Sequence, residues 1–447
     1  MEGHDARESV RRGFEWLLSF ANSFDWTERR RRIEAQLLAT TRPLARLPTS
    51  DDFRSVSVVD DRIGWYLYLA ETWLDRPDSY EPIQGARVLP IFERLGRHIE
   101  LLDRIGGVRE KCLDLLGPQR GGPDGGLFEI LTALMYARDG WRSVELIPPS
   151  RTGRSPDIRV QSGAAEWFVE CKRLVGRSDY STSERKRWLR LWDPLAKKLL
   201  EQRLPLVFEI CFHVELVSLP DDFVVNALAD KLPLVVPPCT VFENHEWTVR
   251  VRPVDMDGIQ ERLKNSFVKN PSDQLQELII GCRVRQGGCT TVFLAKGGTV
   301  GPPTGTNRFI ESIGFAAGAV WDCDAQRSIE IRARDIRSQL ANALEQLPAR
   351  APSVVHVGLE TLDGWAVEKE RFERICRTVL SFDARGRSLH WIYCHLFQPY
   401  SPPEADWVLD ETVYFFRRGE YEGPAPLKRH SLIVPDENAR PGVHWKP

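Results

Sequence analysis

Two carboxylates and one amine lie close together in the stretch RSPDIRVQSGAAEWFVECKRLVG, residues 154–176. Asp157, Glu170 and Lys172 stand there among apolar and β-branched residues that favour strands. If SGAA is a four-residue connection, the two flanking strands pair in the register that sets Asp157 directly opposite Glu170. The sequence therefore predicts a hairpin with two acids facing each other.

This register separates polar from apolar side chains. Alternation along paired strands assigns one face to Ile158, Val160, Trp167, Val169 and Cys171. The other face receives Asp157, Arg159, Glu166, Phe168, Glu170 and Lys172. Phe168 is the only large apolar side chain on the polar face, which supports the predicted pairing.

Opposed carboxylates repel each other unless a cation lies between them, because their Cβ atoms are only about 4.5–5.5 Å apart. Carboxylate oxygens and water suit Mg²⁺ or Mn²⁺, which need few protein ligands. Lys172, two residues from Glu170 and on the same face, adds a positive charge. A metal and an amine together can lower the pKa of a water molecule and stabilise charge that develops on a phosphate group.

A third acid precedes the hairpin. Glu129 is the sole acid in the apolar helical segment LFEILTALMYA, where a carboxylate without a partner is costly. We expect helix packing to bring Glu129 to the same face and to complete a second metal position.

The predicted elements place these residues in an αβββαβ succession. A helix over 127–140 is followed by strands over 141–149, 155–161 and 166–174, then by a basic helix over 183–203 and a strand over 204–216. A second helix-to-strand unit, 328–350 and 352–360, repeats the pattern, so either unit could supply the last core strand. Further strands are predicted at 246–255, 289–298, 388–398 and 411–416, and a helix at 258–270.

Glu129, Pro156-Asp157 and Glu170-Cys171-Lys172 together resemble the PD-(D/E)XK nuclease superfamily and its restriction-endonuclease-like core, over roughly residues 125–217. The resemblance implies an α/β fold with a mixed sheet. It also implies that Asp157, Glu170, the backbone carbonyl of Cys171 and Glu129 hold Mg²⁺ or Mn²⁺. Lys172 would orient or activate the attacking water, with Glu129 as an auxiliary acid. No departure from the motif is visible.

Three regions are predicted along the chain. Apolar residues at helical spacing define an all-α N-terminal domain over 1–118, which ends in the Gly/Pro stretch GPQRGGPDGG. The nuclease core follows over 119–220, and an α+β region occupies 221–447, where 330–361 could contribute the last core helix and strand.

The expected function is a metal-dependent endonuclease that cuts DNA. A role in bacterial defence against phage or other foreign DNA is expected from the resemblance alone. The alternatives are an RNA-cutting enzyme of the same fold and a non-catalytic module that binds nucleic acid or protein. A homodimer or a regulatory protein partner is compatible with each.

Charge limits where nucleic acid could bind. The 447 residues carry a net charge of −2, so any polyanion site must be local. Basic clusters occur at 29–36, 183–192 and 332–339, and the first and last are interpreted as solvated helix faces. The middle cluster, on the helix after Lys172, is the candidate for phosphate contacts through Arg185, Lys186, Arg187 and Arg190.

The sequence gives weaker support for other kinds of catalytic or metal site. No GxSxG nucleophile motif and no Walker-type phosphate loop is found, which argues against a serine hydrolase and an intrinsic ATPase. His390, Cys394 and His395 fall on two faces of one predicted strand, which favours a role in the sheet over a metal cluster, and His213 and His356 are interpreted as core histidines. No apolar run could span a bilayer and no secretory signal is visible, so we expect a cytoplasmic protein with nine reduced cysteines.

Overall fold

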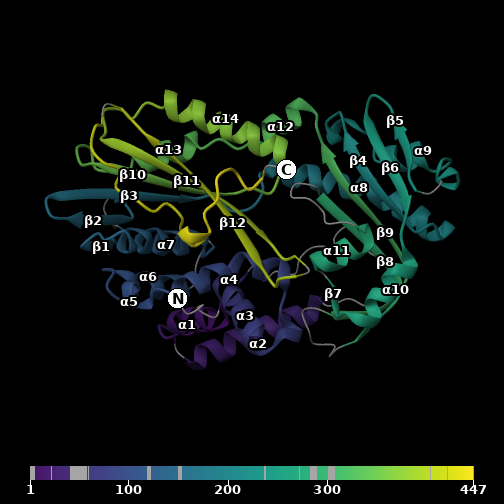
Figure 1. Cartoon of the computed structure of the whole chain (residues 1–447), viewed down its shortest axis with the longest axis horizontal. Helices are drawn as coiled ribbons and strands as arrows, with labels where there is room; N and C mark the ends of the chain where they lie inside the picture. Colours follow the sequence, from purple (N-terminus) through teal and green to yellow (C-terminus); the bar gives the residue numbers. More distant parts are fainter. Residues whose placement is uncertain are drawn as a thin grey trace.

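The structure of the chain is a computed structural model. It describes residues 6–21, 23–40, 58, 60–117, 122–149, 154–235, 238–270, 272–281, 289–300, 308–402, 404–419 and 421–445. Within these residues, two mixed sheets of six strands each stand side by side and helices cover them (Figure 1). The predicted α/β class with mixed sheets is confirmed.

The first sheet contains the hairpin. Its strand order is β1-β2-β3-β10-β11-β12. The pairs β3–β10 and β10–β11 are parallel, and the other three pairs are antiparallel. The strands are β1 (Ser143–Leu146), β2 (Ile158–Ser162), β3 (Ala165–Arg173), β10 (Ser353–Glu360), β11 (Leu389–Tyr400) and β12 (Val408–Arg417).

The hairpin has the predicted register. Ile158 pairs with Val169 and Ser162 pairs with Ala165, so that the next residue before β2, Asp157, faces Glu170. The chain reverses at Gly163, whose φ of 62° lies in the left-handed region that glycine adopts without a steric penalty. The glycine turn and the alternation of polar and apolar residues indicate the same pairing, and the predicted register of the β2–β3 hairpin is confirmed.

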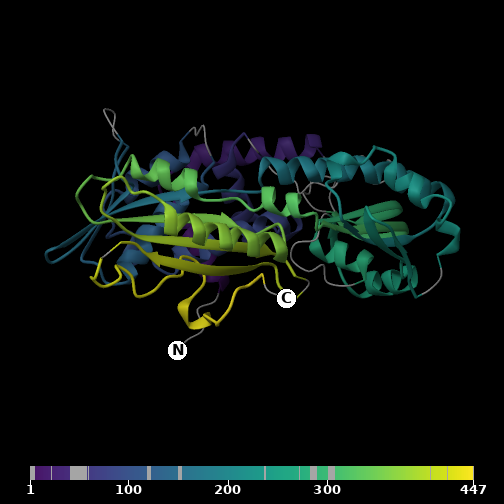
Figure 2. The same ribbon diagram turned by 90° about the horizontal axis from the view of Figure 1, so that it is seen from above.

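Strand β3 is covered on both faces (Figure 2). Trp167, Val169 and Cys171 pack into a core that includes α7 (Asp124–Arg138). Phe168 and Leu174, on the opposite face, contact a second core with side chains of α13 (Arg337–Leu344) and α14 (Trp365–Ser381). On the Phe168 face, Glu170 is buried, whereas the other polar side chains of the hairpin stay partly exposed.

The N-terminal part of the chain is helical, as predicted. Its buried side chains share one core with α7 and the first sheet. The helices are α1 (Ala6–Leu18), α2 (Ser23–Thr40), α3 (Arg62–Asp75), η1 (Pro77–Ser79), α4 (Pro82–Gly96), α5 (Ile99–Leu102) and α6 (Val108–Leu116). Residues 118–121 of the predicted Gly/Pro linker lie outside the described residues, and α7 begins three residues earlier than the predicted start at Leu127.

The second sheet is built from chain that lies between β3 and β10. Its order is β5-β6-β4-β9-β7, with β8 also paired to β9. The strands are β4 (Leu206–Phe212), β5 (Thr240–Glu243), β6 (Trp247–Pro253), β7 (Val268–Asn270), β8 (Cys289–Val300) and β9 (Arg308–Cys323). The helical segments are α8 (Asp179–Gln202), η2 (Leu216–Ser218), α9 (Phe223–Leu228), η3 (Leu232–Leu234), α10 (Met256–Asn265), α11 (Asp273–Ile280) and α12 (Gln326–Arg332).

The strand after the basic helix does not join β1–β3. Strand β4 is central in the second sheet, where it pairs with β6 and β9. The place beside β3 belongs to β10, within the alternative unit at 330–361. A contiguous core over 119–220 is therefore incorrect, because the parallel partner of β3 comes from the far side of an inserted sheet.

Two predicted helices differ in extent. The segment 328–350 is divided between α12 and α13. The helix predicted over 258–270 ends at Asn265, and Val268–Asn270 form β7, which pairs with β9. In the described part of the chain, no helix is both long enough and apolar enough to cross a membrane.

Candidate functional site

Asp157 occupies the bend immediately before β2. Its Oδ2 atom accepts a hydrogen bond of 2.8 Å from the backbone N–H of Cys171 on β3. The backbone N–H of Asp157 donates to the carbonyl of Val169 at 3.1 Å. Both bonds fix the carboxylate beside the strand that carries Glu170 and Lys172.

Glu170 is fully buried on β3, on the face that carries Phe168. Its Oε1 atom accepts from Lys172 Nζ at 2.5 Å and from Gln346 Nε2 at 2.5 Å. Its Oε2 atom is buried and has no hydrogen-bond donor among the described residues. One oxygen of this carboxylate is therefore satisfied and the other is not.

Glu129 reaches the same group of charges from α7. It forms an ion pair with Lys111 of α6, and the two side chains are 17% and 18% exposed. The charges of Asp157 and Lys172 also act on the Glu129 carboxyl group. Lys111, Glu129, Asp157 and Lys172 therefore form one group of charges. Helix α7 packs on the face of β3 that carries Cys171, so the prediction that Glu129 lies on the face of Glu170 is wrong.

The acids of this cluster are hard to ionise together. Burial, reinforced by the charge of Asp157, raises the pKa of Glu170 to about 8 and that of Glu129 to about 7. Burial also raises the pKa of Asp157, although the Cys171 N–H and Lys172 act in the opposite direction. Asp157 and Glu170 can share a hydrogen bond when one of them carries a proton. Only with all three acids ionised would their negative charge exceed the positive charge of Lys111 and Lys172.

The donor set suits a hard divalent cation. Asp157, Glu170 and Glu129 supply carboxylate oxygens, the ligand type that Mg²⁺ and Mn²⁺ prefer. The buried Oε2 of Glu170 is a ready acceptor, and leaving such an oxygen unpaired is costly. The three acids do not each bring an oxygen within 4.8 Å of the other two, so among the described residues they do not form a three-ligand cation site. Binding of Mg²⁺ or Mn²⁺ here stays a prediction. A role for the carbonyl of Cys171 stays a prediction.

Two members of the cluster were not predicted from the sequence. Lys111 lies on α6, and Gln346 lies in the turn after α13. Neither belongs to a local motif, and both reach the site only through tertiary packing. Lys111 carries a polar head on a partly buried stem, which is a weak signal because many surface lysines do the same.

The basic helix α8 lies against the second sheet (Figure 1). Lys186 and Arg190 are exposed, whereas Arg187 donates to the carbonyls of Leu216 and Leu219 and pairs with Asp221. Arg187 therefore holds a loop in place and is not free for phosphate, contrary to the prediction. Phosphate contacts by Arg185, Lys186 and Arg190 stay a prediction.

The other two basic clusters are used within the fold. Arg29, Arg30 and Arg31 pair with Asp61, Glu71 and Glu28, respectively. In the last cluster, Arg332 pairs with Asp322 at 3.2 Å, and Arg337 donates to Ser381. Both clusters were interpreted as solvated helix faces, but Arg29 and Arg332 are buried, so the interpretation is wrong for these two residues.

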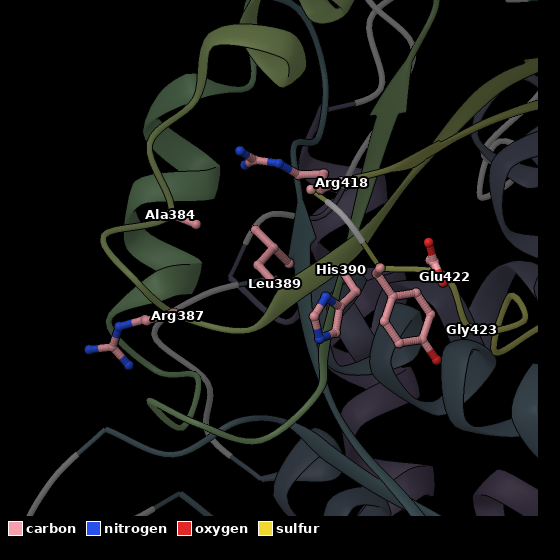
Figure 3. Close-up of a pocket in the computed structure, with 9 residues that line it drawn as sticks. Ala384, Arg387, Leu389, His390, Arg418, Glu422 and Gly423 are labelled. Atoms are coloured by element: carbon pink, nitrogen blue, oxygen red, sulfur yellow. The ribbon is translucent and has the colours of Figure 1, made fainter.

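His390 and its neighbours on β11 do not form a metal cluster. Cys394 and His395 are buried on opposite faces, as predicted. His390 stacks on Tyr421 with ring centroids 4.4 Å apart and lines a cavity of about 560 Å³ with Arg387 and Arg418 (Figure 3). The cavity lies at the start of β11, and its lining includes none of the acids of the cluster.

Two buried histidines belong to a polar chain through the core. Tyr136 Oη contacts His356 Nε2 at 3.1 Å, and His356 Nδ1 contacts His395 Nε2 at 3.0 Å. His395 Nδ1 then contacts Glu411, which accepts the backbone N–H groups of Leu432, Ile433 and Val434. His356 is a satisfied core histidine, as predicted. His213 is not, because its side chain is 32% exposed.

Comparisons with protein-family models, with curated proteins and with solved structures found no match for this chain. The function must therefore be argued from the site itself.

Proposed function

We propose that the chain is a metal-dependent nuclease that hydrolyses phosphodiester bonds, with DNA as its substrate. The observation that carries the proposal is the convergence of Asp157, Glu170 and Lys172, with an unpaired carboxylate oxygen at its centre. Opposed carboxylates beside an ammonium group are what a cation-assisted attack on phosphate requires.

Each side chain has a distinct role in this proposal. Asp157 and Glu170 would hold Mg²⁺ or Mn²⁺, with Glu129 as an auxiliary acid; the metal would neutralise phosphate charge and lower the pKa of a water molecule. Lys172, 18% exposed and fixed by Glu170, is placed to orient a water molecule and to stabilise a developing anion. Lys111 holds the Glu129 carboxylate, and Gln346 holds that of Glu170.

The arrangement of elements also supports the proposal. Helix α7 is followed by the antiparallel strands β1, β2 and β3, and β10 lies parallel to β3 after α13. This succession agrees with the αβββαβ core that the PD-(D/E)XK resemblance implies, with its last unit drawn from 330–361. A restriction-endonuclease-like core is therefore part of the proposal, and so are the cytoplasmic location and the defence role.

The proposal is tested by incubating the full chain with plasmid DNA and, separately, with RNA, each with Mg²⁺ or with EDTA. We expect cutting of DNA that needs the metal. Lys172→Ala should lower the rate at least about a hundredfold, because the group acts mainly in the transition state. Lys369→Ala, which removes an exposed lysine on α14, should leave the rate unchanged.

Three other results would each reject a part of the proposal. Metal-dependent cutting of RNA alone would assign the other substrate. Binding of DNA without cutting, in every metal tested, would leave a non-catalytic module. Equal rates for Lys172→Ala and Lys369→Ala would show that the cutting arises elsewhere.

A further inference from the structure

Three side chains with metal-binding atoms meet in the second sheet, apart from the acid cluster. Cys211 lies on β4, His213 follows the end of β4, and Asp324 follows the end of β9. One ligand atom from each, the Cys211 sulfur, a His213 ring nitrogen and an Asp324 oxygen, lie within 4.8 Å of one another. The three come from adjacent central strands of one sheet.

The backbone holds these residues in place. Strands β4 and β9 are parallel, and Cys211 is the partner of Asp322. Beyond the strand ends, the N–H of His213 donates to the Glu246 carbonyl at 2.7 Å, and the N–H of Asp324 donates to the Phe212 carbonyl at 2.9 Å. Because Cys211 and His213 are two residues apart on extended chain, their side chains share a face.

The His213 ring is oriented from both sides. Its Nε2 atom contacts Thr248 Oγ1 at 2.9 Å, and its Nδ1 atom lies 2.9 and 3.1 Å from the two carboxylate oxygens of Asp324. A histidine that binds metal through one nitrogen commonly has the other fixed by a hydrogen bond to a neighbouring group. Thr248 can supply that bond and leave Nδ1 for a ligand.

The neighbouring polar groups are already committed. Asp322 pairs with Arg332 at 3.2 Å, and the Cys323 thiol donates to the Val214 carbonyl at 3.4 Å. Asp324 is 53% exposed, so the site is open to solvent on one side. The available donors are therefore one sulfur, one imidazole nitrogen and one carboxylate, with room for water.

We infer that Cys211, His213 and Asp324 form a binding site for a borderline-soft divalent cation such as Zn²⁺. Sulfur and imidazole favour Zn²⁺ over Mg²⁺, and three protein ligands plus a water molecule complete a tetrahedral shell. Tetrahedral ligands around Zn²⁺ lie about 3.3–3.8 Å apart, so the His213–Asp324 contact would open by about half an ångström. The exposed Asp324 side chain permits this movement.

Titration of the reduced, metal-free full chain with Co²⁺ tests the site. A thiolate ligand gives cobalt a charge-transfer absorption in the near ultraviolet, which carboxylate sites lack. We expect this absorption to saturate at one equivalent, to disappear on addition of Zn²⁺ and to persist in excess Mg²⁺. Cys211→Ser should abolish it and weaken Co²⁺ binding at least about tenfold.

The matched control is Cys376→Ser, which removes a thiol from α14 beside the first sheet and should leave the absorption unchanged. Asp324→Asn, a change at an exposed side chain, should keep the absorption but weaken binding about tenfold, so that the test survives if Cys211→Ser misfolds. Asp157→Asn should have no effect on the absorption, which separates this site from the proposed nuclease site. Absence of the absorption in the unaltered chain, or its survival in Cys211→Ser, would overturn the inference.

Discussion

Two buried glutamates on adjacent strands of the first sheet have opposite electrostatic environments. Glu360 of β10 accepts from Arg87 at 2.5 Å, from Arg173 at 3.0 Å and from the Gly176 N–H at 3.1 Å. Burial alone would raise its pKa, but the charges of Arg87 and Arg173 lower it below its ordinary value. Glu170 of β3 has one lysine and one amide as donors, and its pKa rises to about 8.

The difference separates an acid that holds the fold together from one that is available for chemistry. Two guanidinium groups and a backbone N–H satisfy both oxygens of Glu360, so this acid needs nothing further. Glu170 keeps one oxygen unpaired and faces the further negative charge of Asp157. Such an environment costs stability, and a bound cation would remove the cost.

The largest effect is expected at Glu360. Glu360→Gln leaves the partly buried guanidinium groups of Arg87 and Arg173 without this anion and should lower the free energy of unfolding by about 3–5 kcal/mol. Denaturant-induced unfolding measures the loss. As a control, Glu100→Gln breaks an exposed pair with Arg12 and should cost under about 1 kcal/mol. Similar losses of unfolding free energy for both variants would show that the ion pairs of Glu360 stabilise the fold no more than an exposed pair.

Glu170 should respond in the opposite direction. In EDTA at pH 7, Glu170→Gln should raise the free energy of unfolding by about 1–3 kcal/mol, because glutamine is neutral without taking up a proton on folding. The folded state of the unaltered chain holds a proton that the unfolded state releases. The contribution of Glu170 to stability is therefore present below pH 4.5, its ordinary pKa, and is lost as the pH rises to about 8.

Thermal unfolding across this pH range, in EDTA, checks the prediction. The difference between Glu170→Gln and the unaltered chain should widen from pH 5 to pH 8. The Glu360 contribution should stay constant over this range, because its pKa lies below 4.5 and its contribution is lost only as the pH falls below that value. A pH-independent difference for Glu170→Gln would show that the carboxylate is ionised throughout.

The smallest change in unfolding free energy is expected when one hydrogen-bond donor to Glu170 is removed. Gln346→Ala takes away the amide that donates to Glu170 and should lower the free energy of unfolding by about 1 kcal/mol. Gln36→Ala removes an exposed hydrogen bond to Asp60 and should change it by less than about 0.5 kcal/mol. Equal effects in denaturant unfolding would mean that the Gln346 bond adds nothing to the site.

The sequence predicted the hairpin well because its information is local. Alternating polarity and the turn at Gly163 fix the register, and the register alone sets Asp157 opposite Glu170. Glu129 was found because an acid within an apolar helical segment needs a partner. That partner proved to be Lys111, which no local pattern indicates.

What the sequence could not predict depends on contacts between distant segments. The segments of β4 and β10 both read as buried strands after a helix, and only packing decides that β10 pairs with β3. Arg187 belongs to a basic run, but its guanidinium is used by a loop some thirty residues further on. The sequence shows that a charged residue is present, but only the fold determines which residue it contacts.

The insertion of a whole sheet between β3 and β10 has a consequence during synthesis. Phe168 of β3 pairs with Ser353 of β10, which is synthesised much later. At about 5–20 residues per second, that delay is on the order of 10–40 s, during which β3 has one open edge. Gln346, which fixes Glu170, leaves the ribosome almost as late. Asp157 and Glu170 are therefore synthesised long before the strand and the glutamine side chain that hold Glu170 in its folded position.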